Sequence, residues 1–137
     1  MDMLGKYPLP EDTYKKFEAL LSSHVNKYNK GDKLFFIGYN AKFDSDFVRQ
    51  FMSLNNNKYY GSYFWNPYID LMTIAASQLM NERDSMPDFK LATVARMLGL
   101  DVDNERLHDA EYDIYITMRI YSRLLQKPMF DTSILGS

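Results

Sequence analysis

Apolar residues recur at helical spacing near the start of the chain. The residues that recur every three or four positions, with polar residues between them, are Tyr14, Phe17, Leu21, Val25 and Tyr28. This pattern predicts an amphipathic helix over about residues 11–29. Gly31 then ends it, as glycine commonly ends helices.

The next apolar segments are shorter and predict strands. Residues 34–39 are continuously apolar, which predicts a central parallel strand buried on both faces. A helix over residues 44–54 follows. The aromatic run over residues 63–70 predicts a second strand, which Pro67 confines to a sheet edge or a strand end.

Three further helices complete the pattern. They are expected over residues 71–80, from Pro87 or Asp88 to Gly99, and over residues 110–126. Strands separated by helices predict an α/β domain that is short of strands. A chain of 137 residues fits one domain, residues 1–137.

Composition and charge narrow the function only slightly. The chain is 46% hydrophobic and 15% aromatic, which excludes a disordered protein, and it has no cysteine for a disulfide or a thiolate site. A net charge of −2 means that any phosphate binding must be local. No stretch approaches the roughly 20 apolar residues of a membrane span, and no signal peptide is recognisable, so we expect a cytoplasmic protein.

Two aspartates fall beside apolar rows of their predicted helices. Asp44 shares a face with Phe47 and Phe51, whereas Asp46 lies on the opposite, solvated side. Asp44 is therefore either a helix-capping residue or a metal ligand at the carboxyl end of a strand. Asp113 sits beside the apolar rows of the last helix and should have a cation, a salt bridge or strong donors as its partner. These rows are Ile114, Met118, Tyr121 and Leu125, and Ile116, Thr117, Ile120 and Leu124.

The two histidines differ in their surroundings. His24 lies on the apolar stripe of the first helix and is expected to be structural. His108 precedes the helix that carries Asp113, and Asp109 is expected to complement the dipole of that helix. From this loop His108 could deprotonate a water molecule at neutral pH.

Three segments together resemble a known family. They are residues 37–44 (Ile-Gly-Tyr-Asn-Ala-Lys-Phe-Asp), Asp70-Leu71, and residues 108–113 (His-Asp-Ala-Glu-Tyr-Asp). They resemble the second and third motifs of DnaQ-like 3′→5′ exonucleases of the DEDDh type, which are related to the proofreading epsilon subunit of bacterial DNA polymerase III. The resemblance extends from about Glu11 to Leu125.

The resemblance implies an RNase H-like fold and a site for two divalent cations, Mg²⁺ or Mn²⁺. Asp44 and Asp113 would be metal ligands, and His108 the general base. Asn40 would lie beside the substrate, a 3′ end of DNA or RNA. Phe43 could stack on a base, with core packing as the alternative. A polymerase or another replication protein is a possible partner.

The family's first motif, an Asp-x-Glu on the opening strand, has no counterpart before the first helix. We therefore expect an N-terminally truncated fold, the C-terminal two-thirds of the family domain, that is inactive alone. The strand over residues 34–39 would then need an oligomer, a partner chain or a rearrangement of the fold itself to cover its edge. The alternative function is a non-catalytic module that binds nucleic acid or protein. Candidate phosphate contacts are Lys42, Lys58, Arg83, Lys90 and Arg96.

Overall fold

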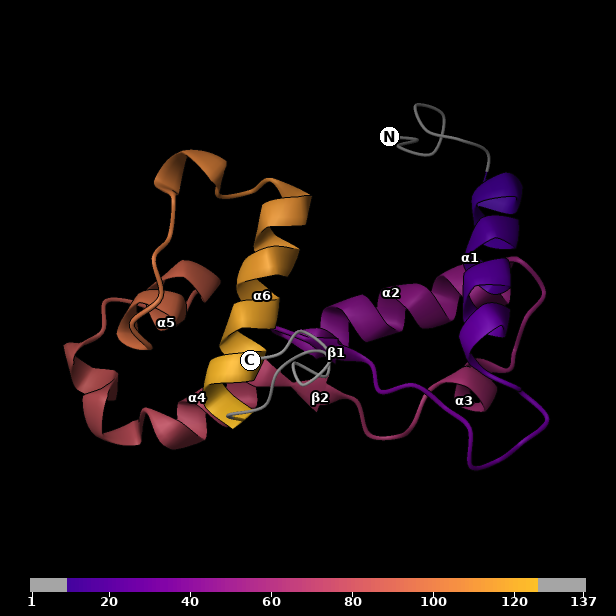
Figure 1. Ribbon diagram of the computed structural model, residues 1–137, viewed down its shortest axis with the longest axis horizontal. Coiled ribbons are helices and arrows are strands. Elements are labelled where there is room, and N and C mark those ends of the chain that lie inside the picture. The colour runs from indigo at the N-terminus through magenta and orange to yellow at the C-terminus, as the bar shows by residue number, and fades with distance from the viewer. Residues whose placement is uncertain (1–9, 126–137) are drawn as a thin grey trace, which may run out of the picture. The chain divides into compact units, whose positions relative to one another are not determined.

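The computed structural model describes residues 10–125, which divide into two compact units. The described parts of unit 1 are residues 10–37 and 41–69, and those of unit 2 are residues 38–40 and 70–125. Each unit is described by itself below. The chain passes from one unit to the other between residues 37 and 38, 40 and 41, and 69 and 70. Figure 1 shows the helices and strands of both units.

Unit 1 contains three helices, α1 (Pro10–His24), α2 (Ala41–Leu54) and α3 (Tyr60–Tyr63). The first two correspond to predicted helices, although α1 ends five residues before the predicted residue 29. Their apolar faces meet in one core made of Tyr14, Leu21, Val25, Met52, Tyr60, Tyr63 and Phe64. His24 is exposed, so its expected place on the apolar stripe of α1 is wrong.

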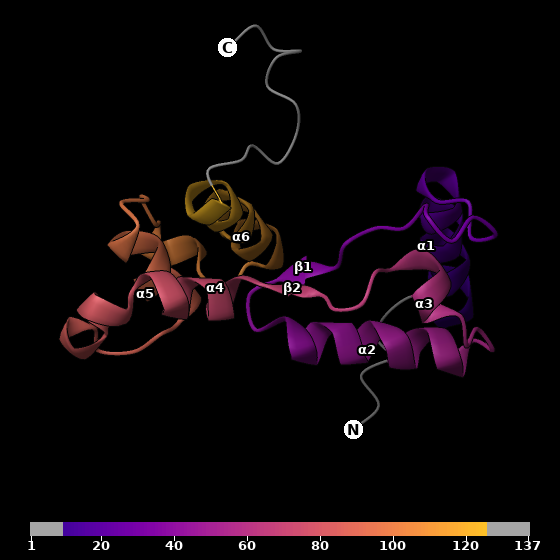
Figure 2. The same cartoon turned by 90° about the horizontal axis from the view of Figure 1, so that it is seen from below.

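A narrow sheet forms from two short strands, β1 (Ile37–Gly38) and β2 (Ile69–Asp70), which run side by side in Figure 2. A parallel bridge between Leu34 and Phe64 precedes them. The Leu34 N–H donates to the Tyr63 carbonyl at 2.8 Å, and the Ile69 N–H donates to the Phe36 carbonyl at 2.8 Å. A parallel strand in residues 34–39 was predicted, but its pairing with the segment that contains Phe64 and β2 was not.

The predicted burial of this strand on both faces is wrong. Phe35 is 57% exposed, and within residues 10–125 the sheet holds only β1 and β2. Backbone groups of successive strand residues point to opposite edges, so those of Phe35 face away from β2. An apolar run alone does not reveal how many neighbours a strand has.

The predicted strand over residues 63–70 is also only partly correct. Its start belongs to α3, Phe64 forms the isolated bridge, and only Ile69–Asp70 is strand. Pro67 lies between these two pairings, and proline has no N–H for a ladder. The segment is therefore divided into two short pairings.

Unit 2 is helical after β2. It consists of α4 (Leu71–Gln78), the 3₁₀ turns η2 (Met80–Ser85) and η3 (Asn104–Arg106), α5 (Leu91–Met97), and α6 (Ala110–Leu125). The long helix α6 packs against both α4 and α5. Gly99, with a φ of 82°, follows Leu98, the C-cap residue of α5, and ends the helix as predicted. Position 126, the predicted end of the last helix, lies outside the described residues.

The buried face of α6 differs from the predicted one by part of a turn. Tyr112, Ile116, Ile120 and Leu124 are buried, whereas Ile114 is 60% exposed. The second of the two predicted rows is therefore the core row. The first row, which begins at Ile114, lines its exposed margin.

These elements make an α/β protein, as the sequence predicted, and fit an RNase H-like fold. The prediction of one domain over residues 1–137 stays a prediction. Within the described range, no helix is long and apolar enough to cross a membrane.

Candidate active site

The turn after β1 carries the first candidate site residue, Asn40. Its φ is 61°, in the left-handed region that few residues other than glycine adopt. Its N–H donates to Asp70 Oδ1 at 2.9 Å, and the same oxygen accepts the Met72 N–H at 3.0 Å. The Asp70 carboxylate thus caps α4 and at the same time binds the backbone of Asn40. The sequence signal for this role was an aspartate at a strand-to-helix junction.

Tyr39 fixes the same turn from its other side. Its hydroxyl donates to the Phe89 carbonyl, just before α5. Burial raises the pKa of Tyr39 well above its usual value, and the nearby carboxylates of Asp70 and Asp88 raise it further. Because a raised pKa keeps the hydroxyl protonated, it remains a hydrogen-bond donor and ties the turn to Phe89.

Phe43 and Asp44 lie in the first turn of α2 in unit 1. Phe43 is 74% exposed, so core packing does not account for it, and Asp44 is exposed as well. The buried residues of α2 are Ala41, Ser45 and Met52, and the Ser45 hydroxyl lies 2.9 Å from that of Tyr60. The expectation that Asp44 faces the core is wrong, because Ser45, 100° further round the helix, takes that direction.

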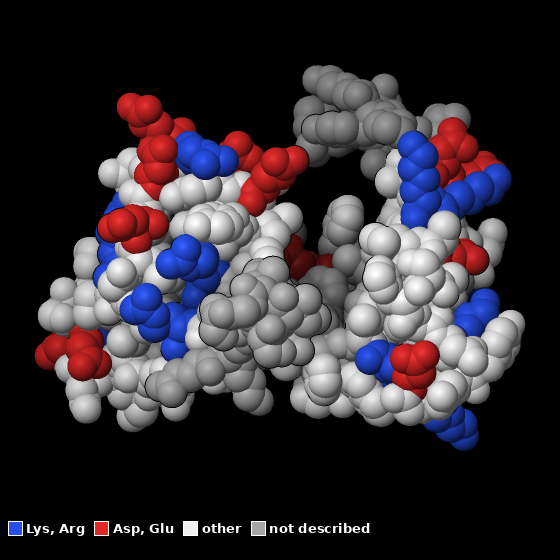
Figure 3. All heavy atoms as spheres, in the orientation of Figure 1, with Lys and Arg blue, Asp and Glu red and all other residues white. Residues whose placement is uncertain are grey.

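The candidate phosphate contacts already have partners in several cases. Lys42 Nζ lies 2.6 Å from Asp46 Oδ2, and this exposed hydrogen bond raises the pKa of Lys42. Arg83 donates to the Met86 carbonyl at 3.4 Å, and Arg96 donates to Asn104. Charges of both signs are interspersed on the face shown in Figure 3. Binding to phosphate by these residues stays a prediction.

His108 lies in the loop between η3 and α6 and is exposed. Its φ is 74°, so it is the second candidate site residue with a left-handed backbone. Asp109 Oδ1 accepts the Glu111 N–H at 3.0 Å, which matches its expected role at the start of α6. The imidazole of His108 is thus accessible to a substrate at the N-terminal end of α6.

Asp113 follows in the first turn of α6 and is half-buried. The ion pairs found between residues 10 and 125 join Lys15 to Glu11 and Lys42 to Asp46. The predicted salt-bridge partner of Asp113 is therefore not among the described residues. The other two expected partners of the Asp113 carboxylate, a cation or strong hydrogen-bond donors, stay predictions.

The structure brings Asn40, His108 and Asp113 into unit 2, while Phe43 and Asp44 belong to unit 1. In the part of the chain that the structure describes, no three His, Asp or Glu side chains gather so that they could hold a metal ion. Two carboxylates, Asp44 and Asp113, are too few donors for a two-cation site. The residues present do not make up that site by themselves.

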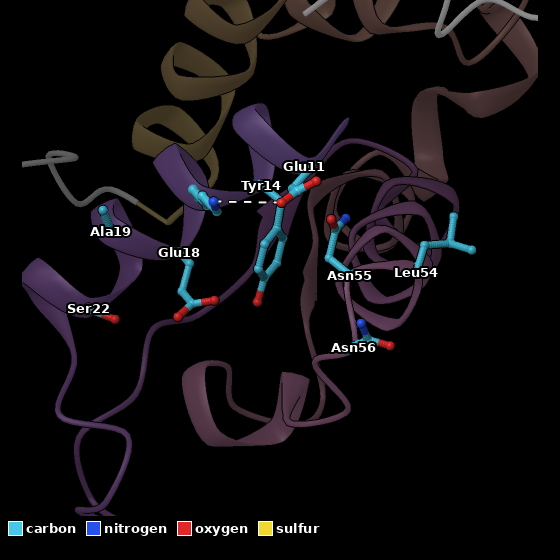
Figure 4. A pocket seen from close by; sticks show the side chains of 9 residues that line it. Glu11, Tyr14, Glu18, Ala19, Ser22, Leu54, Asn55 and Asn56 are labelled. Atoms are coloured by element: carbon cyan, nitrogen blue, oxygen red, sulfur yellow. Dashed lines mark ion pairs between the residues drawn. The ribbon is translucent and has the colours of Figure 1, made fainter. Parts of the chain in front are cut away.

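A groove of about 900 Å³ is lined by residues of unit 1. It runs beside α1 and the end of α2, and none of the predicted site residues lines it (Figure 4). Its charged side chains are Glu11, Lys15 and Glu18, and Lys15 lies 3.6 Å from Glu11. The motif segments therefore do not connect this groove with the predicted nuclease site.

Comparison with known proteins shows the family to which the chain belongs. The family model described as Exonuclease matches residues 1–121, a range that includes both motif segments and all five candidate site residues. No curated protein and no solved structure matches the chain significantly. The chain therefore belongs to the exonuclease family, in the DnaQ-like superfamily.

Proposed function

We propose that the chain is the C-terminal part of a divalent-metal-dependent 3′→5′ exonuclease domain and is inactive without the missing motif. The observation that carries this proposal is the pair of motif segments, in family order, within the matched range. Asn40 and His108 in these segments both have left-handed backbones. Strained residues of this kind gather at functional sites.

The substrate is the 3′ end of a single-stranded DNA or RNA. Asn40 lies beside the terminal nucleotide, and the exposed ring of Phe43 stacks on a base. Such stacking tolerates any sequence, because every base has a π-face. This suits an enzyme that removes nucleotides one after another.

His108 is the general base of the reaction. Neutral imidazole takes a proton from a water molecule, whose oxygen attacks the phosphorus of the terminal phosphodiester. The bond from phosphorus to the 3′ oxygen of the preceding nucleotide breaks, and that oxygen takes a proton from solvent to become the new 3′-hydroxyl. The exposure of His108 in a loop before α6 supports this role. A released nucleoside monophosphate is the product.

Asp44 and Asp113 contribute two of the carboxylates for Mg²⁺ or Mn²⁺, which supply charge stabilisation at the phosphate. The other carboxylates come from an Asp-x-Glu strand, either upstream in the same polypeptide or on a partner chain. We call the chain together with such a strand the completed form.

The test is digestion of a 5′-labelled single-stranded oligonucleotide by the completed form. A ladder that shortens from the 3′ end with Mn²⁺, and stops with a chelator, supports the proposal. Asp44→Ala should remove the activity, while Asp46→Ala on the same helix is the matched control that retains it. Release of the 5′ label as a mononucleotide at early times would contradict the polarity.

A further inference from the structure

We propose that Asp70 is a positioning residue, which holds Asn40 in the conformation that meets the substrate. This inference rests on the proposed function, in which Asn40 lies beside the terminal nucleotide. Asp70 lies in the shortest of the three segments of the resemblance, which contains none of the candidate site residues. Its hydrogen bond to Asn40 is made with the backbone N–H.

One carboxylate oxygen makes the connection. Asp70 Oδ1 accepts the N–H of Asn40 at 2.9 Å and the N–H of Met72 at 3.0 Å. The first bond reaches back 30 residues to the turn after β1, and the second caps α4. A negative charge is favoured at this helix terminus, which helps to keep the carboxylate in place.

The conformation that is held is a left-handed one. With a φ of 61°, Asn40 adopts a backbone conformation that is uncommon outside glycine, although asparagine tolerates it better than most residues do. The Tyr39 hydroxyl, bonded to the Phe89 carbonyl, provides a second tether on the preceding residue. Without the Asp70 acceptor, we expect the Asn40 backbone to relax and its side chain to move from its place.

Amide hydrogen exchange measured by NMR tests the tether directly. Exchange of the Asn40 N–H should accelerate about 10- to 100-fold in Asp70→Ala, as expected for the loss of a hydrogen bond to a charged acceptor. Asp70→Asn retains Oδ1 and should preserve the slow exchange. Unchanged exchange in Asp70→Ala would overturn the proposal.

Two further variants separate the tether from the cap of α4. Asp70→Ser keeps a capping oxygen but has a shorter side chain, so exchange at Asn40 should still accelerate while α4 remains folded. Asp103→Ala removes a comparable cap, the 3.0 Å bond to the Glu105 N–H, and should leave Asn40 unaffected. Slow exchange at Asn40 in Asp70→Ser would contradict the tether even if Asp70→Ala failed to fold.

Binding of a fluorescent oligothymidylate in the absence of metal provides the functional readout. Asp70→Ala and Asn40→Ala should weaken binding by similar factors, the double variant no further, and Asp70→Asn should bind as the unmodified chain does. If Asn40→Ala weakens binding and Asp70→Ala does not, the positioning role is wrong. If Asn40→Ala has no effect, the substrate contact in the proposed function fails, whereas the exchange result still judges the tether.

Discussion

At the scale of single residues, left-handed backbone singles out Asn40 and His108. Among residues 10–125, Asn56 is the other non-glycine residue with a positive φ. Asp70 accepts the N–H groups of Asn40 and of Met72 in α4, so this aspartate joins Asn40 to the start of a helix. His108 directly precedes Asp109, which accepts the Glu111 N–H at the start of α6.

The positive φ of His108 decides which substitution can test its role as the general base. In the completed form, His108→Asn should lower the cleavage rate by roughly 10²–10⁴-fold, the usual contribution of general-base catalysis. Asparagine tolerates a positive φ, so this variant removes the base without straining the loop. Steady-state rates and the binding affinity should be measured together. A rate within about threefold of the unmodified enzyme would contradict the assignment.

A second residue-scale prediction concerns the core of unit 1. Burial raises the pKa of Tyr14 to about 12, while the Asn57 amide donates to its hydroxyl oxygen at 2.6 Å. A pKa that is higher in the folded state stabilises the fold fully below the ordinary tyrosine pKa of about 10. This stability is lost as the pH rises through the folded-state value.

Urea unfolding at about pH 9 and about pH 11 measures this effect, because the two values lie on either side of the ordinary tyrosine pKa. The unfolding midpoint of the unmodified chain should fall between them more than that of Tyr14→Phe. Tyr39, whose pKa is also raised, contributes equally to both proteins and cancels in the comparison. An identical fall in the two proteins would show that Tyr14 ionises as freely in the folded state as in the unfolded one.

At the scale of elements, the apolar pattern predicted the helices better than the strands. Helices α2, α4, α5 and α6 all lie within a few residues of their predicted positions, because each has its own periodic apolar face and a capping or breaking residue. A strand depends on neighbours that a local pattern does not contain. The apolar pattern of residues 34–39 therefore predicts a central strand, although Phe35 is largely exposed in the structure.

The orientation of a helix was harder to predict than its position. On α6, two adjacent apolar rows were equally plausible core faces, and contacts with α4 and α5 decided between them. On α2, the position of Ser45 in the core turned Asp44 outward. The candidate site residues could be named from sequence motifs, but their exposure could not.

A matched pair of isoleucines on α6 tests the orientation. Ile116 is 1% exposed and Ile114 is 60% exposed. Ile116→Ala should lower the free energy of unfolding by about 2–5 kcal/mol, since it leaves a cavity in the core. Ile114→Ala should change it by less than about 0.5 kcal/mol. Equal losses in chemical denaturation would mean that both rows are buried and that the assigned face is wrong.

At the scale of the whole molecule, two findings bear on function: the match to the exonuclease family, and the small number of metal-ligand side chains that lie together in the described residues. The Exonuclease match includes every candidate site residue, yet no metal-binding group of three side chains lies within the described residues. In the proposed function, Asp44 and Asp113 alone supply too few carboxylates to hold two cations. Cleavage should therefore depend on the strand that brings the missing Asp-x-Glu.

The most direct test compares nuclease activity of residues 1–137 with that of the completed form. Both are incubated with Mn²⁺ and a single-stranded oligonucleotide labelled at its 5′ end. We expect no digestion by residues 1–137, progressive shortening from the 3′ end by the completed form, and loss of that activity in Asp113→Ala. Digestion by residues 1–137 alone that disappears in Asp113→Ala would contradict the requirement for the additional strand. Digestion by the completed form that persists in Asp113→Ala would contradict the site itself.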